Sequence, residues 1–146
     1  MFLGVGQLYD RTHSRLIGDY GGLHKRMPRF VALLCLFSVA SFGLPGTGSF
    51  IGEFLVLLGT SEQNMIMVIL AMGGIVLAAS YMLWMLQRVA LGEPATPAAA
   101  GLSDLTALEA VTLVPLAIVT ILVGVYPAPL MEMMDSCVAK LVQFYE

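Results

Sequence analysis

Charged residues are scarce in this chain of 146 residues. Asp, Glu, Lys and Arg together make up 12% of it, against about 25% in an ordinary soluble domain. Hydrophobic residues make up 58%. So few charges cannot cover a globule of this size, which argues against a cytosolic enzyme, and the high hydrophobicity excludes a disordered chain. The composition therefore predicts an integral membrane protein.

The residues that nucleic-acid, metal and redox sites need are also few. The net charge is −3 and no basic face is present, which excludes a nucleic-acid partner. Two cysteines, Cys35 and Cys137, form neither a disulfide framework nor a thiolate metal site. His13 and His24 have no carboxylate or thiol beside them, so we expect them to be solvated rather than to bind a metal. Without a nucleotide loop, a nucleophile–base pair or an iron–sulfur cysteine set, we expect no cofactor, no metal and no catalytic residue in the chain itself.

What the chain does have is long runs free of charge. They cover residues 30–52, 63–87 and 110–131, and about 20 apolar residues suffice to cross a hydrocarbon core of about 30 Å. We expect a single all-α integral membrane region over residues 1–146, with three transmembrane crossings at about 30–60, 64–87 and 108–127. Residues 1–9 are too few to cross and are interpreted as the truncated end of a helix. In residues 130–145, apolar and polar side chains recur at helical spacing. This pattern predicts an amphipathic helix that lies on the outer surface or on a neighbouring subunit.

The basic residues give the orientation of these crossings. Five of the seven lie within residues 10–29, and short loops rich in Lys and Arg stay on the cytoplasmic or matrix side. This places 10–29 and 88–109 inside, and 61–63 and the C-terminus outside. Ser103 or Thr106, the latter with Glu109 three residues on, is expected to cap the last crossing helix.

The first crossing is too long for one helix and carries helix breakers in its middle. An unbroken helix over 30–60 would measure about 46 Å. Gly43, Pro45, Gly46 and Gly48 interrupt it, because proline removes a backbone donor and glycine weakens a helix. We expect two half-helices, about 30–43 and 48–60, joined by irregular backbone of the kind that marks ion and substrate sites in transporters. The alternative is a proline kink without function.

Glu53 lies in this interrupted crossing among apolar neighbours. A carboxylate in hydrocarbon is costly and is by default a candidate for proton relay or ion coordination. The alternatives are a structural ion pair with another helix, or a position near the outer interface from which the side chain reaches water.

Several motifs carry a family resemblance. They are QLYDRTHSR at 7–15, YGGL at 20–23, Met27-Pro28, GLPGTGSFIGEF at 43–54, and GVYP at 124–127 followed by Pro129. Together they resemble the antiporter-like membrane subunits of proton-pumping NADH:quinone oxidoreductase, respiratory Complex I, and within them the chain M (subunit 4) family. The similarity runs nearly end to end, and the joined pattern LPGTGSFIGEF is its most specific part.

The resemblance implies the place of this sequence in a larger fold. Members of the family are built from two inverted repeats, each with one broken helix, and this sequence corresponds to the C-terminal third with the second broken helix. Glu53 aligns with the family's broken-helix glutamate, which is thought to exchange protons with the outer compartment. Sister subunits typically carry lysine there, so glutamate favours chain M. The glutamate–lysine pair of the first repeat and the central lysine have no counterpart, which indicates a fragment or the product of a split gene.

The function implied is that of a membrane-arm subunit of a proton-translocating NADH:quinone oxidoreductase in the respiratory chain. Glu53 would serve proton translocation, while NADH and quinone would bind elsewhere in the complex. The expected partners are the other membrane-arm subunits and the lipid bilayer, in a bacterial inner or mitochondrial inner membrane. The alternatives are a subunit of a related multisubunit cation/proton antiporter or membrane-bound hydrogenase, and a passive membrane scaffold.

Overall fold

The computed structural model describes residues 1–93 and 101–145, and within those ranges the regular secondary structure is helical, with no strand. The helices are α1 (Phe2–Thr12), the 3-10 helix η1 (Ile17–Asp19), α2 (Leu23–Arg26), α3 (Pro28–Ser41), α4 (Gly48–Ser61), α5 (Met65–Ala90), α7 (Ala107–Val125) and α8 (Ala128–Tyr145). Of these, α5 and α7 are long and apolar enough to cross a membrane, whereas α3 and α4 are shorter apolar helices. The side chains at 136, 137, 139 and 141–146 lie outside the described residues, and with them part of the amphipathic face expected for the tail.

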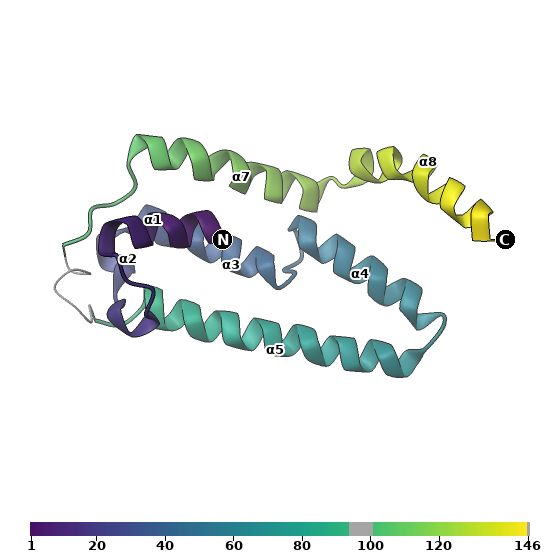
Figure 1. Ribbon diagram of the computed structural model, residues 1–146, viewed down its shortest axis with the longest axis horizontal. Helices are drawn as coiled ribbons and strands as arrows, with labels where there is room; N and C mark the ends of the chain where they lie inside the picture. The colour runs from purple at the N-terminus through teal and green to yellow at the C-terminus, as the bar shows by residue number, and fades with distance from the viewer. Residues whose placement is uncertain (94–100, 146) are drawn as a thin grey trace.

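Three roughly parallel rows of helix make up the molecule (Figure 1). Helices α3 and α4 follow each other in the central row, with α5 on one side and α7 on the other, and both central helices contact both neighbours. Helix α1 lies over α3, where Gly4 faces Phe30 and Leu34. Helix α8 extends beyond α7, away from the end at which α2 lies.

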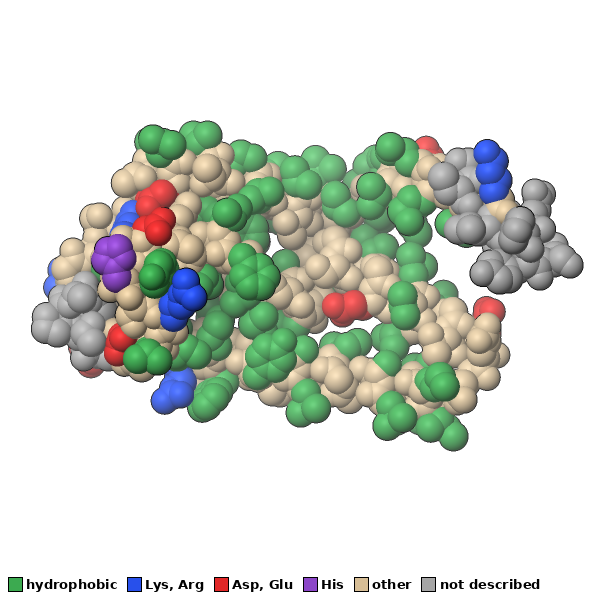
Figure 2. Space-filling model, viewed as in Figure 1, with side chains coloured by type: hydrophobic (Ala, Val, Ile, Leu, Met, Phe, Trp, Pro, Cys, Tyr) green, Lys and Arg blue, Asp and Glu red, His purple; other side chains and the backbone are tan. Residues whose placement is uncertain are grey.

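The long helices expose nearly all of their apolar surface. In α5, large side chains such as Leu70, Val76 and Leu77 are more than 60% exposed, and only Val68, Val89 and Ala90 are buried. Figure 2 shows hydrophobic side chains along the whole length of the visible face, with charged side chains gathered mainly at the end that holds α1 and α2. A helix that is apolar on every side is stable only when it is buried in protein or surrounded by lipid. The exposed surface of α5 therefore fits a lipid-facing helix.

The core lies at the end where the basic segment folds. Its most deeply buried large side chains are Leu23, Met27, Phe30 and Leu113, each at most 2% exposed. The two segments that the basic residues assigned to one membrane side meet here. The N–H of Gly22 donates to the C=O of Leu91 at 3.0 Å.

Two side chains of α2 strengthen this meeting of the segments. Lys25 pairs with Glu93 at 2.7 Å. Nδ1 of His24 lies 2.8 Å from the carbonyl oxygen of Ala90, at the end of α5. The expectation that His24 is solvated is therefore wrong, because its ring binds one of the carbonyls that a helix end leaves without an intrahelical partner.

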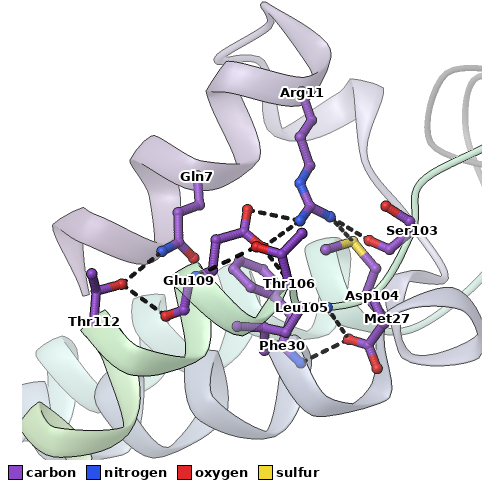
Figure 3. Close-up of polar contacts among 10 residues, drawn as sticks. All are labelled: Gln7, Arg11, Met27, Phe30, Ser103, Asp104, Leu105, Thr106, Glu109 and Thr112. Atoms are coloured by element: carbon purple, nitrogen blue, oxygen red, sulfur yellow. Dashed lines mark hydrogen bonds and ion pairs between the residues drawn. The ribbon is translucent and has the colours of Figure 1, made fainter.

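A polar cluster at the same end joins α1 to α7 (Figure 3). The Arg11 guanidinium donates from Nη2 to both carboxylate oxygens of Glu109, at 2.7 and 2.5 Å, and from Nη1 to the carbonyl of Ser103. Glu109 also accepts from the N–H of Thr106 at 2.8 Å, while Thr106 Oγ1 accepts from the N–H of Glu109 at 3.4 Å. This reciprocal pair is a capping box, and it confirms Thr106 as the cap of α7.

Asp104 supplies a cap that α3 lacks in its own sequence. The residue at the N-cap position, Met27, makes no side-chain cap. Instead, the carboxylate of Asp104 accepts from the N–H groups of Phe30 at 3.3 Å and Arg29 at 3.4 Å. Partial burial acts to raise the pKa of the Asp104 carboxyl. The N–H donors of Leu105, Phe30 and Arg29 and the charge of Arg29 outweigh burial, so that the pKa lies below its ordinary value.

We predict that Asp104→Ala destabilises the fold by about 1 kcal/mol, the usual cost of removing an N-cap acceptor, and that Asp104→Asn retains most of the stability. Because the carboxyl has a lowered pKa, its contribution is complete above the ordinary Asp pKa of about 3.9 and is lost as pH falls through the lowered value. Thermal unfolding of the detergent-solubilised protein at neutral pH and near pH 3 measures both effects. Equal unfolding temperatures for Asp104→Ala and the parent at neutral pH would contradict the capping role.

Candidate functional site

The segment between α3 and α4 is where the sequence placed the site, and its backbone is held by specific turns. α3 ends with two hydrogen bonds, from the N–H of Gly43 to the C=O of Ala40 at 3.4 Å and from the N–H of Leu44 to the C=O of Val39 at 3.3 Å. This pairing is a Schellman motif, which requires a left-handed residue at its turn. Gly43 supplies it with a φ of 73°.

Pro45 and Thr47 separate α3 from α4. Pro45 has no N–H, so the C=O of Ser41, four residues earlier, loses the donor that a continuous helix would give it. Thr47 is 5% exposed, and its Oγ1 donates to the C=O of Leu44 at 2.7 Å while its N–H donates to the same oxygen at 3.0 Å. Gly48 then begins α4. The two helices are thus separated by a turn whose hydrogen bonds are local.

The side chain of Glu53 covers this segment. Helical side chains lean toward the N-terminus of their helix, and from the second turn of α4 this direction leads back to Gly43. A Cβ atom placed on Gly43 would lie 2.7 Å from Cδ and 3.0 Å from Oε1 of Glu53, and closer still to Oε2. The carboxylate therefore rests directly on the glycine of the Schellman turn.

Beside Glu53 is an apolar cleft between α4 and α5. It has a volume of about 350 Å³ and is lined by Glu53 with Gly52, Val56, Leu57, Ala71 and Ile75. The ion pairs Arg11–Glu109 and Lys25–Glu93 do not involve Glu53. The alternative of a structural ion pair for Glu53 therefore finds no support among the described residues. Glu53 is a partly exposed carboxylate beside an apolar cleft and an interrupted backbone.

The last turn of α7 closes the other side of the segment. Gly124 faces the backbone of Gly46 and Thr47, and Val123 faces Gly48. Sequence reasoning did not assign Gly124 to the site, because a glycine before Val-Tyr-Pro gives no sign of a close contact with a distant segment. The helix breakers Gly43, Pro45, Gly46 and Gly48 all lie in this one region together with Glu53.

The site combines one carboxylate with an interrupted backbone. Helix ends beside a carboxylate are the kind of backbone that lines ion and substrate sites in transporters. Among the described residues, no group of three or more His, Cys, Asp or Glu side chains could hold a metal ion.

The chain is similar to known membrane proteins over almost its whole length. Residues 1–78, more than half of the chain, match the family described as NADH:quinone oxidoreductase/Mrp antiporter, TM. NADH-quinone oxidoreductase subunit M of Rhodobacter capsulatus is 43% identical over 99% of this chain, and NADH-ubiquinone oxidoreductase chain 4 of Marchantia polymorpha is 41% identical over 98%. The chain spans only 28% and 29% of the length of these two relatives.

A solved structure shares the fold. One chain of respiratory complex I from Thermus thermophilus with bound NADH superposes with a TM-score of 0.78 and 33% sequence identity, covering 89% of this chain and 27% of that chain. At this identity and score, the two chains share both fold and ancestry over the matched part.

We predict that Gly43→Ala destabilises the protein more than Gly46→Ala does. Both glycines have positive φ, which costs a residue with a Cβ about 1–2 kcal/mol, but only the Cβ at Gly43 would collide with another group, the Glu53 carboxylate. Unfolding temperatures of the two single variants, and of each combined with Glu53→Ala, measure the difference. The excess cost of Gly43→Ala should disappear in the Glu53→Ala background. An excess over Gly46→Ala that persists there would show that the carboxylate does not rest on Gly43.

Proposed function

The chain belongs to the NADH:quinone oxidoreductase/Mrp antiporter transmembrane family, and from this premise we propose that it is part of a membrane-arm subunit of NADH:quinone oxidoreductase. In this role it contributes to redox-driven proton translocation and holds no redox centre of its own. NADH and quinone bind in other parts of the complex. Its partners are the other membrane-arm subunits and the surrounding lipid.

The helix lengths support three crossings of the membrane. Helices α3 and α4 have 14 residues each, about 21 Å at 1.5 Å per residue, so neither alone spans a core of about 30 Å. In this proposal they form one crossing, interrupted at 42–47, and α5 and α7 form the other two. The basic end with α2 then faces the cytoplasm or matrix, and the turn between α4 and α5 faces the opposite side.

The observation that carries the proposal is the position of the Glu53 carboxylate over Gly43. A proton-exchanging group in a membrane needs contact with water or with backbone dipoles, since hydrocarbon offers neither. The interrupted backbone provides this contact at mid-membrane, and the carboxylate lies at the point of interruption. In the proposed cycle, Glu53 takes up and releases a proton as hydration around the break changes.

A second candidate is a subunit of a multisubunit cation/proton antiporter, because the description of the matched family also names Mrp antiporters. The same carboxylate would serve that exchange without NADH. Measurements of proton movement in sealed vesicles distinguish the two functions. A sodium gradient alone would drive proton movement in an antiporter, whereas NADH and quinone would be required in the oxidoreductase.

We predict that Glu53→Gln, placed in the assembled complex, slows NADH:quinone turnover and proton uptake into sealed vesicles by about tenfold or more. Proton transfer by a positioned side chain typically contributes about 10²–10⁴-fold to a rate, and the amide cannot take part in it. Glu53→Asp, which keeps a carboxylate, should retain more activity than Glu53→Gln. Proton uptake, turnover and assembly on a native gel are measured for each variant.

Glu62→Gln is the matched control, since it makes the same change in an exposed residue at the C-terminal end of α4 and should leave activity unchanged. Unchanged turnover and proton uptake in assembled Glu53→Gln would favour a passive scaffold over the proposal. If Glu53→Gln did not assemble, equal activity of Glu53→Asp and the parent would support a titrating carboxylate. Inactive but assembled Glu53→Asp would instead indicate that the length of the side chain is what matters.

A further inference from the structure

The contact between α7 and the break is so close that a side chain has no room in it. A Cβ placed on Gly124 would lie 2.5 Å from the carbonyl carbon of Thr47, and closer still to the carbonyl carbon and oxygen of Gly46. These are backbone atoms, which cannot turn aside as the end of a flexible side chain can. The two backbones therefore touch directly, and any larger residue at 124 must push them apart.

A second glycine makes the same contact from the opposite side. A Cβ on Gly48 would lie 3.0 Å from Cγ1 and 3.4 Å from Cβ of Val123. Neighbouring residues of α7 thus press on 46–48, the segment in which α4 begins. The contact differs from that at Gly124 in one respect, because here the opposing atoms belong to a side chain and lie farther away.

The position of this segment decides where the Glu53 carboxylate lies. Gly48 is the first residue of α4 and Glu53 is in its second turn, so a shift or tilt of the helix start moves Glu53 with it. The carboxylate has almost no freedom on its other side, where it rests on Gly43. Thr47 lies in the backbone that joins the contact at Gly43 to the contact at Gly124. It is 5% exposed, and its hydroxyl donates a hydrogen bond to the C=O of Leu44.

We infer that Gly124 is a positioning residue for Glu53. By letting the last turn of α7 touch the backbone of Gly46 and Thr47, it fixes the start of α4 and so keeps the carboxylate over the break. The inference rests on the proposed function of Glu53. It adds that α7, which carries no charge near the site, sets the geometry of proton exchange.

The test compares Gly124→Ala with Gly73→Ala in the assembled complex. Gly73 lies in the middle of α5, where a Cβ would meet nothing within 4 Å, so the control makes the same substitution in an apolar helix without a contact. We expect Gly124→Ala to slow proton-coupled turnover by on the order of tenfold, because a misplacement of about 1 Å can cost up to about 10²-fold. Gly73→Ala should match the parent.

A second readout reports the position of Glu53 without depending on activity. A hydrophobic carbodiimide reacts with accessible carboxyl groups in membranes, and mass spectrometry of the peptide that holds Glu53 gives the rate of labelling. We expect Gly124→Ala to change this rate several-fold and Gly73→Ala to leave it at the parental value. Equal labelling in Gly124→Ala and the parent would overturn the inference.

A matched pair of substitutions keeps the test decisive if Gly124→Ala does not assemble. Gly48→Ala should produce a smaller version of both effects, and Val123→Ala in the same chain should restore the parental values by making room for the new Cβ. Failure of this rescue would overturn the inference. If Glu53→Gln itself leaves proton uptake unchanged while Gly124→Ala alters the labelling, the proposed function fails and the positioning contact stands.

Discussion

Close contact at three glycines, Gly43, Gly48 and Gly124, is the constraint on which the central part of this structure depends. Gly43 gives the Glu53 carboxylate a place to lie, and Gly48 and Gly124 let α7 approach the segment in which α4 begins. These contacts add to the turn hydrogen bonds and to the packing on α5 and α7 that hold α3 and α4 in place. In a membrane, close packing of this kind takes the place of the hydrophobic force that drives helices together in water, because lipid is as apolar as the side chains it meets.

Several charged residues lie away from that constraint and join the helices elsewhere. Arg11, Glu109 and Asp104 form a polar cluster at one end of the molecule, which joins α1, α3 and α7. The cluster fixes the start of α3 and the start of α7, so that both helices run from one held end toward the break. Glu53 lies far along this path, among apolar side chains. The free-energy cost of a charge explains this separation. An ion pair near water costs little, whereas a charged group in hydrocarbon is costly.

The sequence predicted the features that depend on neighbours along the chain, and it missed those that depend on distant segments. Pro45 and the surrounding glycines indicated a break because their effect on a helix is local, and Thr106 with Glu109 indicated a cap for the same reason. Asp104 was not recognised as the cap of α3, because the two are about 75 residues apart in the chain. Gly124 was missed on the same ground. His24 was expected in solvent, because nothing in its own segment shows that the end of α5 lies against it.

The glycines in the break and in the helix end that faces it have different physical reasons for being glycine. Gly46 has a positive φ, and a Cβ placed on it would meet nothing within 4 Å. Only its backbone conformation therefore demands glycine. Gly124 lies within helix α7, and only the lack of room demands glycine there. Gly43 meets both demands, since it turns the chain and receives the carboxylate. A glycine-rich pattern alone would be explained by a flexible kink. The contacts instead describe a break whose shape is fixed from two sides, as the proposed role of Glu53 would require.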